Sequence, residues 1–218
     1  MAKLALFPLN TVLFPGMQVR LHIFEDRYKL MINRCIETGE AFGVVLIRQG
    51  SETMGKLAEP FMVGCTAKIS EVQRLPMQRI NIVTVGQRRF RIRDLNYSEP
   101  YLVGEVEYFM PADDDPPRVR QCGRILRPLL AKYLEALHAD NSSQFDAEQL
   151  PDSPRAVAQI ASILLHSDNY QKQHLLEMDS LSKLLEALIE IYRIETMLLD
   201  IRLSPPGKYF DIGPFSSN

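Results

Sequence analysis

The sequence of 218 residues contains no tryptophan and only three cysteines, and its formal net charge is −2. The cysteines Cys35, Cys65 and Cys122 are odd in number and far apart, which argues against a disulfide framework and indicates a reducing compartment. The small net charge excludes a global attraction to nucleic acid or anionic lipid. No apolar run reaches the roughly 20 residues of a membrane span, and the first residues do not form a secretory signal. We therefore expect a cytoplasmic protein that does not enter a membrane.

The histidines lack the spacing of a metal site, and no cofactor motif is complete. His22 falls in a predicted strand, and the others fall near predicted helix ends, where a partly positive ring is favourable. Residues Gly50–Lys56 match the first seven positions of a phosphate-binding P-loop, but Leu57 replaces the required Ser or Thr. Pro60 leaves no room for the helix that must follow such a loop. We expect an exposed loop there, with no bound metal or cofactor.

A second incomplete motif is the Ser-x-x-Lys sequence at Ser180–Lys183, which is typical of serine acyl-enzymes. The companion element of this motif, Ser167–Asn169, precedes Ser180–Lys183 instead of following it, and the gap between the two is too short. The third element, Lys-Thr-Gly, is absent. Ser180 also falls in the first turn of a predicted helix, where serine is common for capping reasons. We therefore predict no catalytic residues. An enzyme of unknown type would need a deep pocket with converging titratable groups.

The first half of the chain has the patterns of β-strands with one early helix. Apolar residues at helical spacing from Glu25 to Thr38, followed by Gly39 as a C-terminal cap, predict that helix. Leu75, Pro76 and Met77 form the turn of a predicted hairpin. The predicted strands are residues 4–6, 19–23, 42–47, 63–72, 80–85, 90–95 and 102–109. These elements predict a compact, barrel-like β domain over residues 1–112.

The second half has the patterns of helices. Pro111–Pro117 is a polar connector, and an amphipathic stripe from Val119 to Leu137 predicts a helix that Pro128 should kink. Ser153-Pro154 predicts the start of the next helix, which runs to about His166. Two more helices are predicted, one over residues 170–177 and a long one that Asp179 caps and that ends at residue 204. We expect a helical subdomain over residues 113–204 and a tail over 205–218.

The tail contains the aromatic residues Tyr209, Phe210 and Phe215 among three prolines, two of them consecutive, and two glycines. Burial of an aromatic ring can offset the entropy lost when a tail is ordered. We therefore expect these three rings to dock on the body of this chain or on a second copy of it.

The strongest charge feature is the run from Arg88 to Arg93. Strand geometry places Arg89, Arg91 and Arg93 on one face, and Phe90 and Ile92 on the other. One interpretation is a solvated outer face whose arginines pair with Glu105 and Glu107 on the next strand. The others are an acidic protein partner or a nucleic acid.

The opening of the chain has two Phe-Pro steps, at Phe7-Pro8 and Phe14-Pro15, and reaches Arg27-Tyr28 through an alternating stretch. This opening resembles the N-terminal, substrate-recognition domain of the Lon protease family. Later segments resemble the family in order and spacing, although Cys65 is inserted in one and Met77 replaces a usual polar turn residue. They are Glu40–Leu46, Val63–Ile69, Arg74–Pro76, Val85–Phe90, and Lys172–Glu177 followed by Leu184–Glu186.

The resemblance implies an α+β fold, with a PUA-like β pseudo-barrel, one early helix and a following α-helical bundle. The sequence lacks the Walker A and Walker B motifs of the family's ATPase module and has no protease module. We therefore expect a stand-alone form of the domain that recognises client or unfolded polypeptides without enzymatic activity, with a protease or chaperone as a partner.

The expected binding surface is apolar, because burial of apolar area is the general source of such affinity. The junction of the two subdomains is a natural place for a groove. We expect contacts from Leu75, Pro76 and Met77 at the hairpin, and from Arg89, Arg91 and Arg93 on the basic strand. The alternative is a PUA-like RNA-binding module that uses the Arg88–Arg93 strand, although the overall charge makes nucleic acid the less favoured ligand.

Overall fold

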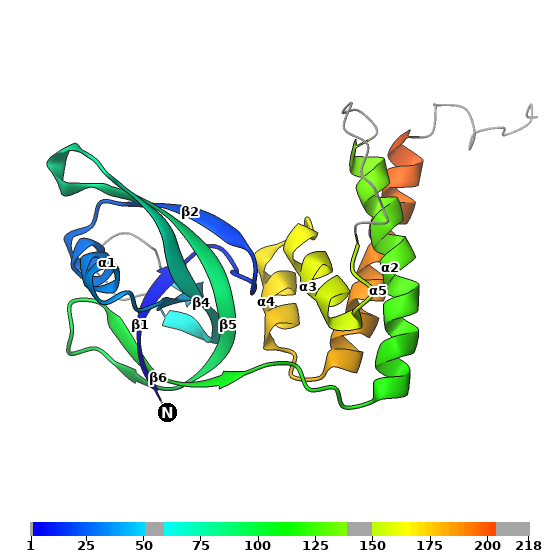
Figure 1. Ribbon diagram of the computed structural model, residues 1–218, viewed down its shortest axis with the longest axis horizontal. Helices are drawn as coiled ribbons and strands as arrows, with labels where there is room; N and C mark the ends of the chain where they lie inside the picture. The colour runs from blue at the N-terminus through cyan, green and yellow to red at the C-terminus, as the bar shows by residue number, and fades with distance from the viewer. Residues whose placement is uncertain (1, 51–58, 139–149, 204–218) are drawn as a thin grey trace, which may run out of the picture.

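The computed structural model describes residues 2–50, 59–138 and 150–203 (Figure 1). Most of the P-loop-like segment and the aromatic residues of the tail lie outside these ranges, so their predictions stay predictions. Two parts are visible, a β barrel formed by the first half of the chain and a group of helices formed by the second. Among the helices of the described ranges, none is both long and apolar enough to span a membrane.

Six strands within the described residues form one sheet in the order β2-β5-β4-β3-β1-β6. They are β1 (Ala2–Leu9), β2 (Gln18–Ile23), β3 (Phe42–Gln49), β4 (Glu59–Arg74), β5 (Ile80–Asn96) and β6 (Leu102–Phe109). β5 also pairs with β6, which closes the sheet into a barrel. The pairing of β1 with β3 is parallel and the other pairings are antiparallel.

One sequence prediction is corrected by strand β5. The sequence predicts separate strands over residues 80–85 and 90–95, but these residues belong to one strand of 17 residues. The intervening Gly86, Gln87 and Arg88 break the local apolar pattern, while β4 pairs with β5 on both sides of this break. Pairing with a neighbouring strand therefore continues the element where the local sequence signal fails.

Helix α1 (Asp26–Thr38) covers one end of the barrel (Figure 1). Its buried residues Tyr28, Met31 and Ile32 belong to the same apolar cluster as Phe7 and Phe42 of the strands. Gly39 ends the helix in the left-handed conformation, with φ of 69°, as the sequence predicts. The barrel interior is a second cluster, which comprises Leu4, Leu6, Val45, Phe90, Ile92, Leu102 and Val106.

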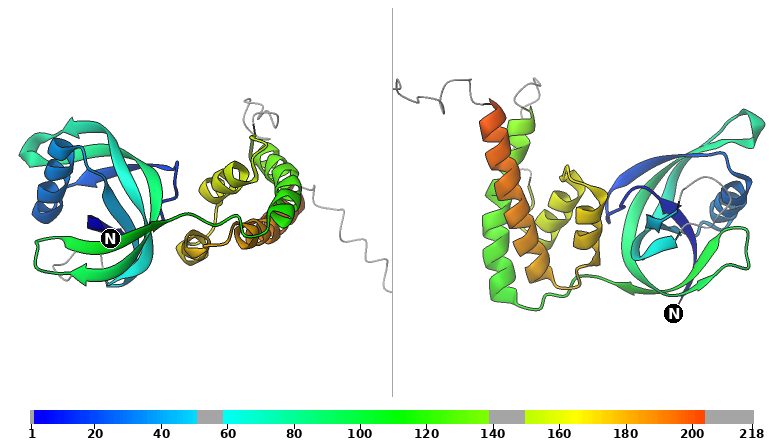
Figure 2. Two further views of the ribbon diagram at one scale, coloured as in Figure 1. Left: turned by 60° about the horizontal axis from the view of Figure 1, so that its bottom comes forward. Right: turned by 180° about the vertical axis from the view of Figure 1, so that it is seen from behind.

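The helical part consists of α2 (Pro116–His138), α3 (Pro154–Leu164), α4 (Asn169–Glu177) and α5 (Leu181–Leu203). Helices α2 and α5 lie side by side, and α3 and α4 lie between them and the barrel (Figures 1 and 2). The rings of Tyr133 and Tyr192 meet edge to face at 5.0 Å between α2 and α5. Helix α2 continues through Pro128, and the predicted kink there stays a prediction.

The starts of helices α3 and α5 lie where the sequence predicts them, but their capping interactions differ from the predicted ones. α3 begins at Pro154 as predicted, but the Ser153 side chain makes no capping hydrogen bond. The predicted cap of α5 was Asp179, whereas the backbone amide of Lys183 donates to the Ser180 hydroxyl at 3.2 Å. Ser180 therefore caps α5, which gives the serine of the Ser-x-x-Lys sequence a structural role.

Candidate functional site

Helix α4 joins the helices to the barrel. The buried Gln173 donates from Nε2 to the carbonyl oxygen of Val63 on β4 at 3.0 Å, and Asn169 donates to the carbonyl oxygen of Asn10 at 2.7 Å. Val63 and Phe14, from the barrel half of the chain, also belong to the main apolar cluster of the helices. The two parts therefore share a continuous core, and a cleft at their junction has well-fixed walls.

Arg89 is the polar centre of this junction. Its side chain is only 6% exposed, and its Nη1 donates to the carbonyl oxygens of Leu175 at 3.2 Å, Leu176 at 3.0 Å and Met178 at 3.2 Å. These carbonyls lie at the C-terminal end of α4, where a positive charge is favourable. The expectation that Arg89 lies on an exposed face is therefore wrong, because the helices cover this part of β5.

Burial lowers the pKa of Arg89 to about 10, the nearby Cys65 thiol opposes this shift, and the charge of Arg155 adds to it. The guanidinium still carries its charge at neutral pH. Burial also raises the pKa of Cys35 to about 11 and of Cys65 to about 12, which disfavours the thiolate form of both.

The other arginines of the basic run have different partners from those of Arg89. Arg93 pairs with Glu107 at 2.6 Å, as one interpretation of the sequence predicts. The guanidinium of Arg91 lies 4.8 Å from the ring centre of Phe109, and that of Arg88 lies 4.1 Å from the ring centre of Tyr108. The run therefore forms no continuous basic stripe.

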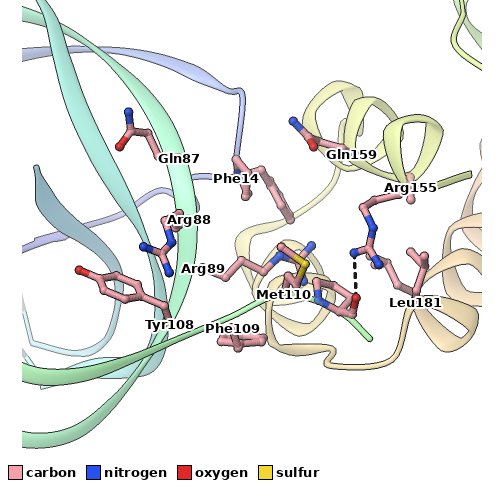
Figure 3. Close-up of a pocket in the computed structure, with 14 residues that line it drawn as sticks. Phe14, Gln87, Arg88, Arg89, Tyr108, Phe109, Met110, Arg155, Gln159 and Leu181 are labelled. Carbon is pink, nitrogen blue, oxygen red and sulfur yellow. Dashed lines mark hydrogen bonds between the residues drawn. The ribbon is translucent and has the colours of Figure 1, made fainter. Parts of the chain in front are cut away.

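A cleft of about 320 Å³ lies between the barrel and helices α3 and α5 (Figure 3). Its lining is apolar and cationic, without aspartate or glutamate. The residues are Phe14, Pro15, Gln87, Arg88, Arg89, Tyr108, Phe109, Met110, Pro111, Arg155, Ala158, Gln159, Leu181 and Leu184. Met110 is 71% exposed and stands at the opening of the cleft, whereas Leu181 and Leu184 are buried in its wall.

The barrel wall of the cleft depends on Gly86. The backbone amide of Gly16 donates to the carbonyl oxygen of Gly86 at 2.8 Å, and the amide of Gly86 donates to that of Met17 at 2.9 Å. A Cβ at position 86 would collide with the carbonyl oxygen of Phe14. Glycine therefore lets the turn at residues 14–17 approach β5, which places the Phe14 ring against the helices (Figure 3).

The helical wall depends on contacts of the connector between β6 and α2. Arg155 donates from Nη1 to the carbonyl oxygen of Pro111 at 2.8 Å (Figure 3). The amide of Ala112 donates to the carbonyl oxygen of Asp179 at 2.6 Å, and the amide of Leu181 donates to that of Ala112 at 2.8 Å. The connector is thereby held against the starts of both α3 and α5.

The predicted hairpin residues lie elsewhere, at the tip of the β4–β5 hairpin that projects from the barrel away from the helices (Figure 1). Met77 is 76% exposed. Met77 and Gln78 both have φ of 58°, which is the backbone of a type I′ turn and is unusual without Asn or Gly. Leu75, Pro76 and Met77 are therefore far from the cleft, and of the expected contact residues Arg89 alone lines it.

The sequence predicts a groove at the junction but not most of the residues that form it. Phe14 belongs to the second Phe-Pro step, and Arg155 follows the Ser-Pro start of a helix. Nothing local marks Met110, Gln159 or Leu184 as neighbours of those residues. Within the described residues, no cluster of three or more metal-ligating side chains occurs.

The protein has an α+β architecture, in which a PUA-like barrel with one early helix is followed by a helical bundle. This architecture confirms the predicted fold class. A crystal structure of a Lon N-terminal domain protein from Xanthomonas campestris is similar, with a TM-score of 0.64 and 27% identity over 87% of this chain and 98% of that one. The N-terminal domain of a Mycobacterium avium complex Lon protease is similar in fold, with a TM-score of 0.69 and 21% identity over 88% and 98%.

Sequence comparison gives the family directly. The model of the ATP-dependent protease La (LON) substrate-binding domain matches residues 3–193, and the chain belongs to this family. A Lon protease 2 of Herpetosiphon aurantiacus is 25% identical over 204 residues, which is 91% of this chain and 24% of that protein. The chain thus spans about a quarter or less of the curated relatives it matches.

Proposed function

We propose that this protein binds polypeptides without chemical change to them, and that apolar segments of the polypeptide occupy the junction cleft. The observation that carries the proposal is the apolar lining of the cleft, with Phe14, Phe109 and Leu184 in its walls and Met110 exposed at its opening. Membership in a substrate-binding domain family supports it.

The size of the cleft suits weak and sequence-tolerant binding. Full burial of one apolar side chain contributes about 1.5–3 kcal/mol, part of which offsets the entropy lost on association. The flexible and polarisable side chain of Met110 adapts to different partners. Met77, at the hairpin tip with Leu75 and Pro76, gives a second apolar contact that a long unfolded chain can reach at the same time.

The proposal includes a protease or chaperone that receives the bound polypeptide, because the relatives that match are Lon proteases. It places the protein in the cytoplasm, since its three cysteines are free and buried, as in proteins of reducing compartments. RNA binding has less support. The arginines of the basic run are engaged with carbonyl groups, with Glu107 or with aromatic rings.

The test is fluorescence anisotropy with a labelled, permanently unfolded polypeptide. The exposed methionines allow a matched comparison of Met110→Ser in the cleft with Met77→Ser at the hairpin tip. We expect the unchanged protein to bind, Met110→Ser to weaken binding several-fold, and Met77→Ser to weaken it less. Unchanged affinity in Met110→Ser with a large loss in Met77→Ser would move the site to the hairpin, and no binding at all would contradict the function.

A further inference from the structure

The cleft carries an excess of positive charge that the binding of an apolar segment does not explain. Three of its lining residues are arginines, Arg88, Arg89 and Arg155, and its lining includes no carboxylate. Throughout the described ranges, the ion pairs of arginine are made elsewhere. They involve Arg27, Arg48, Arg93, Arg118 and Arg127.

Each guanidinium of the cleft uses only part of its capacity on the protein. A guanidinium has five N–H donors. Arg89 bonds the end of α4 through Nη1, Arg155 bonds Pro111 through Nη1, and Arg88 lies with its plane against Tyr108. The remaining N–H groups of Arg89 and Arg155 have no acceptor among the described residues.

The positions of Arg89 and Arg155 make this charge significant. Arg89 extends from β5 and Arg155 from α3 into the same cleft, close enough for the charge of one to disfavour the charge of the other (Figure 3). Arg89 is nearly fully buried, so water screens this repulsion poorly. An anion between the two guanidinium groups would relieve the repulsion and accept their unused hydrogen bonds.

We propose that the cleft binds the C-terminal residue of a polypeptide, with the terminal carboxylate at Arg89 and Arg155 and the last apolar side chain against Phe109 and Met110. This inference rests on the proposed function and adds the class of segment that the site selects. A chain terminus carries a carboxylate and an apolar side chain on one residue, which matches guanidinium groups and apolar walls within one small cleft.

The volume of the cleft favours a terminus over an internal segment. About 320 Å³ is at the lower limit of ligand pockets, which hold a compact group rather than a long strand. An internal segment must also enter and leave the cleft, and its neutral peptide groups would leave the two guanidinium groups without an anion. Charge and size together therefore select the end of a chain.

The test uses three short peptides with an N-terminal fluorescein label, all of which end in Leu-Leu. The first has a free C-terminal carboxylate, the second a C-terminal amide, and the third an amide with Glu placed before the last leucine pair. We expect the free acid to bind about tenfold or more tightly than either amide, the range of a charge-assisted hydrogen bond in a shielded site.

Arg155→Gln should remove most of this preference, measured as the ratio of the affinities of the same variant for the free-acid and amide peptides. Arg93→Gln is the matched control, because it removes the same charge from an ion pair outside the cleft and should leave the preference unchanged. If Arg155→Gln does not fold, Arg88→Gln replaces it, since Arg88 is exposed and its loss should reduce the preference less. Circular dichroism checks the fold of each variant.

Equal binding of the acid and amide peptides would overturn the inference and leave the proposed function in place. Binding of the internal Glu peptide as tight as that of the free acid would overturn the selection of a terminus. Absence of binding by all three peptides, together with absence of binding to the unfolded polypeptide, would overturn both proposals. A tenfold preference for the free-acid peptide that is lost in Arg155→Gln and retained in Arg93→Gln would support the inference.

Discussion

At the scale of single residues, Arg89 and Arg93 show how the fold assigns different roles to one repeated side chain. Both lie on β5, yet Arg89 is buried and bonds three carbonyl groups, whereas Arg93 is exposed and pairs with Glu107. Strand alternation alone predicts the same face for both. The sequence could not show that α4, 86 residues further along the chain, covers the first of them.

Arg89→Met should therefore destabilise the protein by about 2–3 kcal/mol, because it leaves buried carbonyl groups at the end of α4 without donors. Arg93→Met should cost at most about 1 kcal/mol, since an exposed ion pair contributes little. Urea unfolding of the two variants measures the difference. Equal losses would show that Arg89 does not hold α4 to the barrel.

The turn at the hairpin tip gives a second prediction at this scale. Gln78 has φ of 58°, a conformation that costs an L-residue about 1–2 kcal/mol and glycine nearly nothing. Gln78→Gly should stabilise the protein by about 0.5–1 kcal/mol, after the greater freedom of glycine in the unfolded chain is subtracted. Gln78→Ala keeps the Cβ and is the control. A thermal midpoint no higher for the glycine variant than for the alanine variant would contradict the assigned turn.

At the scale of elements, the start of α5 is fixed by the connector that precedes α2. The Asp114 carboxylate accepts hydrogen bonds from the hydroxyl of Ser180 at 2.7 Å, the hydroxyl of Ser182 at 3.1 Å and the backbone amide of Ser182 at 3.3 Å. Sequence patterns found the helices and most of the strands because those depend on local periodicity. They missed this contact and the continuity of β5 because both depend on partners far along the chain.

The Asp114 contact predicts a pH dependence. The hydrogen bond from Ser180 is the main cause that lowers the pKa of Asp114, and the bonds from Ser182 add to it. A carboxylate whose pKa is lower in the folded than in the unfolded state stabilises the protein above the unfolded value, near about 4, and this contribution is lost as pH falls through the folded value.

Asp114→Asn should therefore lower the urea midpoint at neutral pH, and its difference from the unchanged protein should narrow as the pH falls below about 4. Asp113→Asn removes the same charge from the neighbouring residue and is the control. A difference that stays constant with pH would mean that the Asp114 carboxylate does not hold the start of α5.

At the scale of the whole molecule, the cleft forms where five segments of the chain meet. They are residues 14–15, residues 87–89 with 108–111, residues 155–159 and residues 181–184. Composition and periodicity predict that a barrel and a helical bundle exist and that a junction lies between them. They do not predict which side chains face each other there, because that depends on how α4 orients the bundle through Arg89, Asn169 and Gln173.

The most direct test of the central claim, that polypeptides bind in the junction cleft, is site-specific photo-cross-linking. A benzophenone side chain replaces the exposed Gln159 at the lip of the cleft, and in a matched variant it replaces the exposed Arg120 of α2, which does not line the cleft. After irradiation with a labelled unfolded polypeptide, we predict strong cross-linking from position 159 and background cross-linking from position 120. Equal cross-linking from the two positions would contradict the claim.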